Sequence, residues 1–299
     1  MRDLFTGVGV ALITPFNDDK SIDFDALKNL LNEINAGGVD YLVVNGTTSE
    51  ASTINTQEKL EILEFVKANN PKGLPIMYGI GANDTQAVIN TIKEMNFEGI
   101  SAILTVTPYY NKPSQQGLIA HYTAIADIAP RPVLLYNVPG RTGINMTANT
   151  TLQLAEHENI FGIKEASGDL NQALDIVNGK PEDFMLISGD DMLTVPMCSI
   201  GGEGVISVLA NGYPKEFTKT IHAALEGDFK ASTPLLCSFT GINNMLYEES
   251  NPVGIKEVLN NKGICKNNVR LPLMSASPGL AERIEREHNI IEEFHSIIA

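Results

Sequence analysis

A lysine closes one of the short apolar runs of the sequence, because Lys164 follows Ile160–Ile163 directly. If this run is a buried strand, the amine projects from its end into a mouth with little water, which disfavours the charged form of lysine. A neutral amine attacks carbonyl carbons, and the ketimine that it forms with a 2-oxo acid acidifies the neighbouring methyl group. The resulting enamine can attack an aldehyde. An isolated lysine is usually solvent-exposed, so the residues around Lys164 must support this hypothesis.

Hydroxyl side chains follow two other apolar runs. Tyr136 lies near the end of the run before that of Lys164, so its phenol can lie beside the amine and shuttle protons during imine and carbon–carbon bond formation. Thr47 and Thr48 follow a glycine in a tight turn, whose hydroxyl and N–H groups can hold a carboxylate and pass on a proton. Taken alone, the tyrosine is equally consistent with core packing, and the turn with helix capping.

Two further side chains are candidates for substrate recognition. Arg141 lies in a Pro-Gly-Arg-Thr-Gly segment and can form a bidentate pair with the carboxylate of a second substrate, a geometry that lysine cannot reproduce. A solvated loop arginine is the alternative. Tyr110 ends a Pro-Tyr-Tyr segment and indicates an aromatic corner exposed at a mouth or at an interface, where ordinary interface packing is a strong competing interpretation.

The elements that must position these groups alternate between short apolar runs and segments with helical spacing. Continuous apolar strands separated by helices indicate a parallel sheet buried on both faces, which is either a closed barrel or an open doubly wound sheet. No glycine fingerprint follows the first run, where an open nucleotide-binding sheet would carry one. We therefore predict an α/β protein with a (β/α)8 barrel, whose catalytic groups lie at the C-terminal ends of the strands. The eight predicted strands are Val8–Ile13, Tyr41–Val44, Pro75–Gly79, Ser101–Thr105, Val133–Asn137, Ile160–Lys164, Phe184–Ser188 and Gly204–Val208.

The strand pattern ends well before the end of the chain. After Gly227-Asp228 only helical patterns follow, broken by Asn251-Pro252 and Leu271-Pro272. We predict a catalytic barrel over residues 1–227 and a C-terminal helical extension over residues 228–299. Within the barrel, Asn55 three residues before a glutamate predicts a capping box, and Asp169 is expected to cap the helix after the sixth strand.

Composition excludes several classes of partner. The formal net charge of −15 lacks the Lys/Arg surplus that nucleic acid or an anionic membrane requires, so we expect neither as a partner. The sequence contains neither a long apolar run nor a secretion-signal pattern, and its three widely spaced cysteines match no disulfide framework. These features favour a cytoplasmic protein. The five histidines show no metal-ligand spacing, and we expect no catalytic metal and no cofactor.

Several segments, in this order along the chain, resemble the pyruvate-dependent class I aldolase superfamily and, within it, the dihydrodipicolinate synthase family. The similarity extends from Phe5-Thr6-Gly7 to Arg270-Leu271-Pro272-Leu273, which is nearly the whole chain. The segments that carry it are Gly46-Thr47-Thr48-Ser49-Glu50, Tyr109-Tyr110-Asn111-Lys112-Pro113, Tyr136-Asn137-Val138-Pro139-Gly140-Arg141-Thr142-Gly143, Gly162-Ile163-Lys164-Glu165-Ala166 and Ser188-Gly189-Asp190-Asp191.

The resemblance implies roles for individual residues. The implied catalytic residues, a Schiff-base lysine, a proton-transferring tyrosine and two members of a proton relay, are Lys164, Tyr136, Thr47 and Tyr110. The implied substrate-binding residues are Thr48, Arg141, Ile206 and Gly189. Family members place the second tyrosine of the Tyr-Tyr pair in the site of a neighbouring subunit. The resemblance therefore implies a homo-oligomer, at least a dimer and usually a tetramer built as a dimer of dimers.

The resemblance also implies a reaction, the condensation of pyruvate with L-aspartate 4-semialdehyde to give 4-hydroxy-tetrahydrodipicolinate in lysine and diaminopimelate synthesis. Related N-acetylneuraminate lyases carry Ser-Thr in the turn and no arginine after the proline. Thr47 and Arg141 therefore favour the condensation over cleavage of N-acetylneuraminate or 2-keto-3-deoxygluconate. A non-catalytic barrel that binds a 2-oxo acid as a sensor is a further alternative, but a sensor would not need the whole proton relay.

Some positions depart from the family pattern without removing a reacting group. Ser49 replaces a glycine, Gly140 replaces a common serine, and Asn251-Pro252-Val253-Gly254 replaces Asn-Pro-Ile-Pro. Lysine-inhibited members carry histidines on the helix after the Thr-Thr turn, where this chain has Thr56 and Lys59. A cation at Lys59 would repel a lysine ligand, so we predict weak or absent inhibition by lysine.

Overall fold

The strands of the chain form a closed parallel barrel. The computed structural model describes residues 1–297, and in it each strand pairs with the next while β8 closes the ring against β1. The predicted (β/α)8 barrel is confirmed, and the observed strand ends differ from the predicted ones by at most two residues. The strands are β1 (Gly7–Ala11), β2 (Tyr41–Val44), β3 (Ile76–Gly79), β4 (Ala102–Val106), β5 (Val133–Asn137), β6 (Ile160–Glu165), β7 (Met185–Ser188) and β8 (Gly204–Ser207).

Successive strand residues alternate between the barrel interior and the layer of helices, which gives two separate apolar cores. At the N-terminal end of the barrel, helix α1 (Arg2–Phe5) inserts Phe5, whose ring lies 5.1 Å from that of Tyr41 and 5.5 Å from that of Phe161. Gly9 leaves the space for the Tyr41 ring, because a Cβ there would lie 2.0 Å from a ring carbon. This end is closed, so a ligand must enter from the other one.

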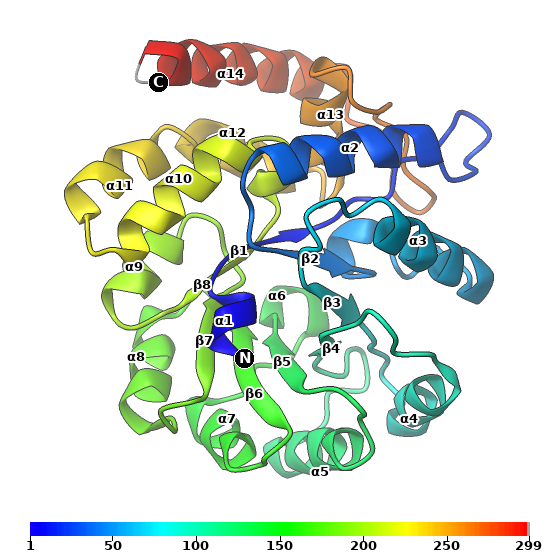
Figure 1. The fold of residues 1–299 in the computed structure, drawn as a ribbon, viewed down its shortest axis with the longest axis vertical. Coiled ribbons are helices and arrows are strands. Elements are labelled where there is room, and N and C mark those ends of the chain that lie inside the picture. The colour runs from blue at the N-terminus through cyan, green and yellow to red at the C-terminus, as the bar shows by residue number, and fades with distance from the viewer. Residues whose placement is uncertain (298–299) are drawn as a thin grey trace.

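Helices surround the barrel as a ring (Figure 1). The predicted helix starts are confirmed: Asn55 and Glu58 form a capping box, and the Asp169 side chain accepts hydrogen bonds from the first turn of the next helix. The helices of the ring are α2 (Phe24–Ala36), α3 (Thr56–Ala68), α4 (Thr85–Glu94), α5 (Gln115–Ala126), α7 (Ala148–Ala155), α8 (Leu170–Gly179), α9 (Thr194–Ser199) and α10 (Pro214–Leu225).

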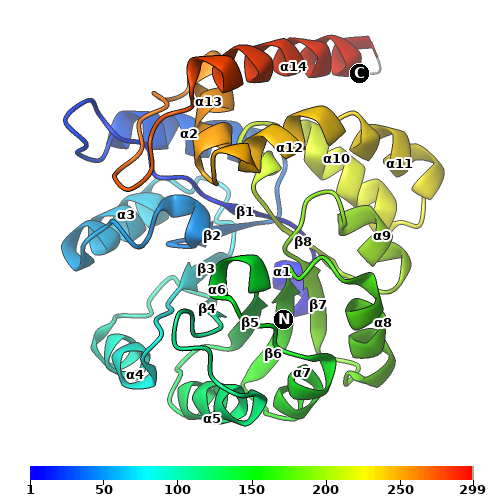
Figure 2. The same cartoon turned by 180° about the vertical axis from the view of Figure 1, so that it is seen from behind.

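The C-terminal part of the described residues is helical, as predicted. Helix α14 packs against α12 and α13 along one side of the ring, whereas α11 packs against α10 (Figures 1 and 2). We propose that the extension begins at residue 228, after α10. Its helices are α11 (Phe229–Cys237), α12 (Thr240–Glu248), α13 (Val253–Asn261) and α14 (Pro278–Ile297).

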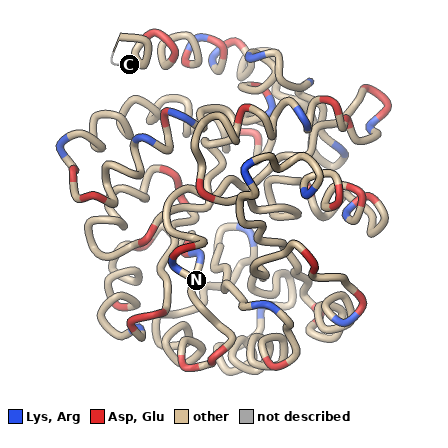
Figure 3. Tube along the Cα trace, viewed as in Figure 1, with Lys and Arg blue, Asp and Glu red and all other residues tan. Residues whose placement is uncertain are grey.

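Charged residues are interspersed along the outer helices, with acidic and basic positions alternating along α14 (Figure 3). Over residues 1–297, no helix combines the length and the apolar character that crossing a bilayer demands.

Candidate active site

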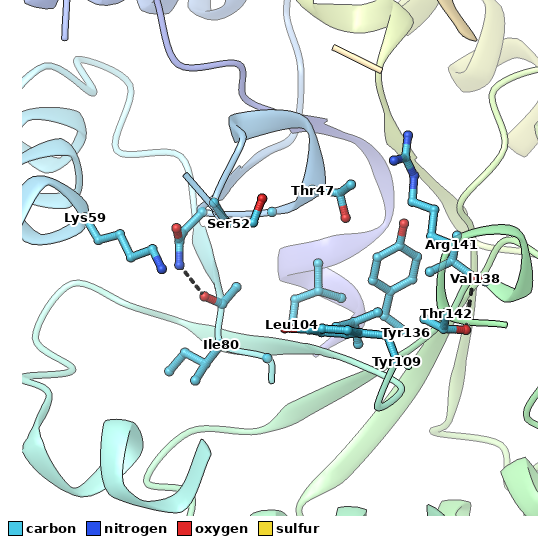
Figure 4. A pocket seen from close by; sticks show the side chains of 16 residues that line it. Thr47, Ser52, Lys59, Ile80, Leu104, Tyr109, Tyr136, Val138, Arg141 and Thr142 are labelled. Atoms are coloured by element: carbon cyan, nitrogen blue, oxygen red, sulfur yellow. Dashed lines mark hydrogen bonds between the residues drawn. The ribbon is translucent and has the colours of Figure 1, made fainter. Parts of the chain in front are cut away.

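A cavity of about 470 Å³ opens at the C-terminal ends of strands β2 to β5. Three of the residues predicted from the sequence line it, namely Thr47, Tyr136 and Arg141. Figure 4 shows the hydroxyl groups of Thr47 and Tyr136 projecting into the cavity, and the Arg141 guanidinium above the Tyr136 hydroxyl in this view. The other lining residues are Asn45, Gly46, Ala51, Ser52, Lys59, Gly79, Ile80, Gly81, Leu104, Val106, Tyr109, Val138 and Thr142.

Lys164 lies directly beside Tyr136. The two residues are register partners on β6 and β5, so both side chains point into the barrel. The Lys164 Nζ atom lies 4.2 Å from the centroid of the Tyr136 ring, and the lysine is only 6% exposed. The predicted contact between the two side chains is confirmed. This arrangement places an amine, which can act as a nucleophile, next to a phenol, which can transfer protons.

Gly189 and Ile206 border the same end of the barrel. A Cβ on Gly189 would lie 2.6 Å from the Cβ of Ala166 and 3.0 Å from the Cε of Lys164. The absence of a side chain at Gly189 therefore leaves the lysine its space. Ile206 is buried on β8 among the residues that fill the barrel interior.

A cluster of hydrogen-bonded polar side chains, not identified from the sequence, links the C-terminal ends of β5 and β6 on the face that points to the helices. Asn137 and Glu165 are register partners on the outer face of the two strands, and the Asn137 amide donates to the Glu165 carboxylate at 3.0 Å. Gln172 donates to the same carboxylate at 2.9 Å, and Asn137 Nδ2 also donates to Asn145 at 2.7 Å. The only available signal was that Asn137 and Glu165 immediately follow the two candidate catalytic residues.

The Thr-Thr turn forms a short 3₁₀ helix, η1 (Thr47–Ser49), after β2. Glu50, which ends it, adopts left-handed backbone angles with φ 59°, and the Ser49 hydroxyl donates to the Gly46 carbonyl at 2.7 Å. Thr47 faces the cavity, whereas Thr48 is buried. The serine that replaces a family glycine thus closes the turn.

Arg141 is carried by the single-turn helix α6 (Pro139–Thr142), whose proline is suited to the first helical position. Its side chain is exposed at the cavity rim. Within the described part of the chain, no ion pair engages Arg141, so its guanidinium is available for an anionic ligand.

Tyr110 does not join the cavity within one protomer. It is 88% exposed and has a φ of 74°, whereas its neighbour Tyr109 lines the cavity. At the other side of the cavity lies Lys59, where burial lowers the pKa of the amine. The candidate site therefore combines the buried pair of Lys164 and Tyr136 with a cavity that Lys59 lines on one side and Tyr109 on the other.

Comparisons with known proteins agree with this geometry. Residues 4–290 match the model of the Dihydrodipicolinate synthetase family. The 4-hydroxy-tetrahydrodipicolinate synthase of Cytophaga hutchinsonii is 54% identical over 284 residues, which cover 95% of this chain and 96% of that protein. Two solved structures are similar over almost the whole chain. The chloride-inhibited dihydrodipicolinate synthase of Acinetobacter baumannii complexed with pyruvate has a TM-score of 0.93 at 35% identity and covers 96% and 99% of the two chains. DHDPS from Cyanidioschyzon merolae with lysine bound has a TM-score of 0.92 at 36% identity and covers 97% and 99%.

Proposed function

Since the chain belongs to the dihydrodipicolinate synthetase family, we propose that Lys164 holds pyruvate as a Schiff base in the cavity at the barrel mouth. The reaction is the condensation of pyruvate with L-aspartate 4-semialdehyde to give 4-hydroxy-tetrahydrodipicolinate, a step of lysine and diaminopimelate biosynthesis. The observation that carries the assignment to Lys164 is its buried amine, 4.2 Å from the centre of the Tyr136 ring.

The first half of the reaction prepares a carbon nucleophile. The Lys164 amine attacks the C2 carbonyl of pyruvate, and loss of water leaves a ketimine. The ketimine draws electrons from C3, so a methyl proton is lost and an enamine forms. Tyr136 is placed to deliver and remove protons in these steps because its phenol projects into the cavity beside the amine.

The second half forms the new bonds. The enamine carbon attacks the aldehyde carbon of the semialdehyde, and Tyr136 donates a proton to the aldehyde oxygen. Thr47 and the neighbouring subunit's Tyr110 relay a proton to Tyr136 in its place. The amino group of the semialdehyde then attacks the ketimine carbon, closes the ring and releases Lys164. The protonated ketimine between Lys164 and pyruvate is the electron sink, so the proposal involves no cofactor.

Arg141 binds the carboxylate of the semialdehyde in this proposal, and Thr48, Gly189 and the backbone at Ile206 bind pyruvate. Arg141→Ala should raise the KM for the semialdehyde on the order of a hundredfold, because a charged hydrogen-bonding partner is lost. Trapping of pyruvate by borohydride should be unchanged. Arg283→Ala, which removes an exposed arginine on α14, is the matched control. Equal semialdehyde KM values in the two variants would show that Arg141 does not bind the semialdehyde. If the enzyme cleaves N-acetylneuraminate faster than it catalyses the condensation, the alternative function of a sugar-acid aldolase is favoured.

We also propose that the protein acts in the cytoplasm as a homotetramer, a dimer of dimers in which Tyr110 completes the site of a neighbouring subunit. Its 88% exposure in one protomer supports this arrangement. Mixing Lys164→Ala subunits with Tyr110→Phe subunits under exchange should restore activity. In each hybrid dimer, one site combines Lys164 of the Tyr110→Phe subunit with Tyr110 of the Lys164→Ala subunit. If hybrids form and no activity returns, Tyr110 does not act across the interface.

A further inference from the structure

A residue of the C-terminal extension reaches the turn that carries the candidate pyruvate-binding hydroxyl. Asn251, between α12 and α13, is 6% exposed, and its Nδ2 atom donates to the Oγ1 atom of Thr48 at 3.0 Å. The two residues are 203 positions apart. The contact is buried, so water does not replace it readily.

The direction of this hydrogen bond matters for the threonine. An amide N–H can only donate, so the Thr48 oxygen is the acceptor and the hydroxyl keeps its own proton for another partner. Within residues 1–297 no other hydrogen bond of the Thr48 hydroxyl is found. The other polar atom of this amide, Asn251 Oδ1, is buried and has no hydrogen-bond partner among the described residues. The proton of Thr48 is therefore available for an anion in the site.

A buried ion pair fastens the same turn to the same segment. Lys256 Nζ lies 2.5 Å from Glu50 Oε1, and the two side chains are 0% and 2% exposed. Glu50 Oε2 accepts the backbone N–H of Arg270 at 2.9 Å, and Lys256 also donates to the Asn268 carbonyl at 2.8 Å. Burial lowers the pKa of Lys256, while the Glu50 carboxylate opposes that shift. Two residues of the turn, Thr48 and Glu50, are thus held by contacts with Asn251, Lys256 and Arg270.

We propose that Asn251 is a positioning residue for pyruvate: it occupies the acceptor side of the Thr48 hydroxyl, so that the hydroxyl proton is directed to the pyruvate carboxylate. The Lys256–Glu50 pair keeps the turn at the distance that this contact requires. Asn251 acts through Thr48 and does not itself touch pyruvate. The inference rests on the proposed function, because it takes Thr48 as a pyruvate-binding residue.

An isosteric substitution tests the direction of the hydrogen bond. In Asn251→Asp the new carboxylate accepts the Thr48 proton and places a negative charge near the pyruvate carboxylate. The KM for pyruvate should rise on the order of a hundredfold, and about tenfold in Asn251→Ala, with kcat changed much less. Asn96→Asp is the matched control, because its side chain only accepts a hydrogen bond, from the backbone of Glu98, and the aspartate keeps that role. An unchanged pyruvate KM in a folded Asn251→Asp variant would overturn the proposal.

A double-mutant cycle separates positioning from general support of the fold. If Asn251 acts through the Thr48 hydroxyl, Asn251→Ala should raise the pyruvate KM about tenfold in the wild-type background but less than about twofold in Thr48→Val. Additive effects would contradict the proposal, and this cycle decides the matter if Asn251→Asp fails to fold. Borohydride trapping is run on the wild-type protein in parallel. Absence of a pyruvate adduct there would reject the proposed function itself, whereas a normal adduct with an additive cycle rejects only the role of Asn251.

Discussion

Two regions of the candidate site, the strand pair that carries Tyr136 and Lys164 and the turn after β2, are held in place by different means. Tyr136 and Lys164 are fixed by the pairing of adjacent strands, supported by the Asn137–Glu165 hydrogen bond directly behind them. The turn at residues 47–50 is fixed by side chains about 200 positions later in the chain. The strand region should therefore keep its geometry when the C-terminal extension is perturbed, whereas the turn should not.

The largest effect is expected from removing the cation that holds the turn. Lys256→Met leaves the Glu50 carboxylate buried without its partner, which should lower the free energy of unfolding by about 3–5 kcal/mol. Denaturant unfolding at a fixed protein concentration measures it. Lys266→Met, which breaks an exposed pair with Asp18, should change stability little.

The same variant tests whether the strand region is independent of the C-terminal extension. Folded Lys256→Met protein should still form the pyruvate adduct at Lys164, at higher pyruvate concentrations than the wild type needs. An adduct that cannot be formed at any pyruvate concentration would show that the strand region also depends on the extension.

A buried carboxylate at the end of β7 provides a pH-dependent contrast, because it lacks the cation that Glu50 has. Asp191 Oδ2 accepts the backbone N–H groups of Val208 and Leu209 after β8, at 3.1 and 3.0 Å. Burial raises the pKa of Asp191 from 3.8 to about 6. The folded protein therefore binds this proton more tightly than the unfolded chain does. The contribution of this proton to the free energy of unfolding is complete below about pH 4 and is lost as the pH rises to about 6. The free energy of unfolding changes by about 3 kcal/mol over this range.

Asp191→Asn should remove this contribution while keeping an oxygen acceptor. The free energy of unfolding, measured from pH 4 to pH 7, should fall less steeply with rising pH in the variant than in the wild type. Parallel curves for the two proteins would contradict the assignment of the titration to Asp191.

A smaller effect should follow from crowding the strand region itself. Gly189→Ala places a methyl group within 3.0 Å of the Lys164 side chain, which must then shift. We expect kcat/KM to fall about 10- to 100-fold, because small displacements of a nucleophile are costly. Stability should also fall, because the new methyl group lies 2.6 Å from the Cβ of Ala166. Gly279→Ala, at a position where a Cβ meets no neighbour within 4 Å, is the control. Equal rates in both variants would show that the lysine has room to spare.

The smallest effect is expected for lysine as an added ligand. Lys59 lines the cavity, and a cation at this position repels a lysine ligand. Activity should therefore change less than about twofold at millimolar lysine, as estimated from charge repulsion. Half-loss of activity at sub-millimolar lysine in an inhibition titration would contradict this prediction.

The sequence alone predicted the barrel and the contact between Tyr136 and Lys164, because both follow from strand order and strand ends. It did not predict Asn251 or Lys256, since their partners lie about 200 positions away and only the folded chain brings them together. The hydrogen-bonded cluster around Glu165 was not predicted for a related reason. Asn137 and Glu165 alternate with the candidate catalytic residues along β5 and β6, so their side chains face the helices. Tyr110 marks a different limit, because its predicted role depends on a second subunit and not on the fold of one chain.

If Lys164 carries pyruvate as a Schiff base, borohydride reduction in the presence of pyruvate makes that bond permanent. Peptide mass mapping of the reduced protein should place a single pyruvate-derived adduct on the peptide that contains Lys164. Lys164→Ala should remain folded and show no adduct. A wild-type protein without an adduct at Lys164, or an adduct that persists in Lys164→Ala, would contradict the account.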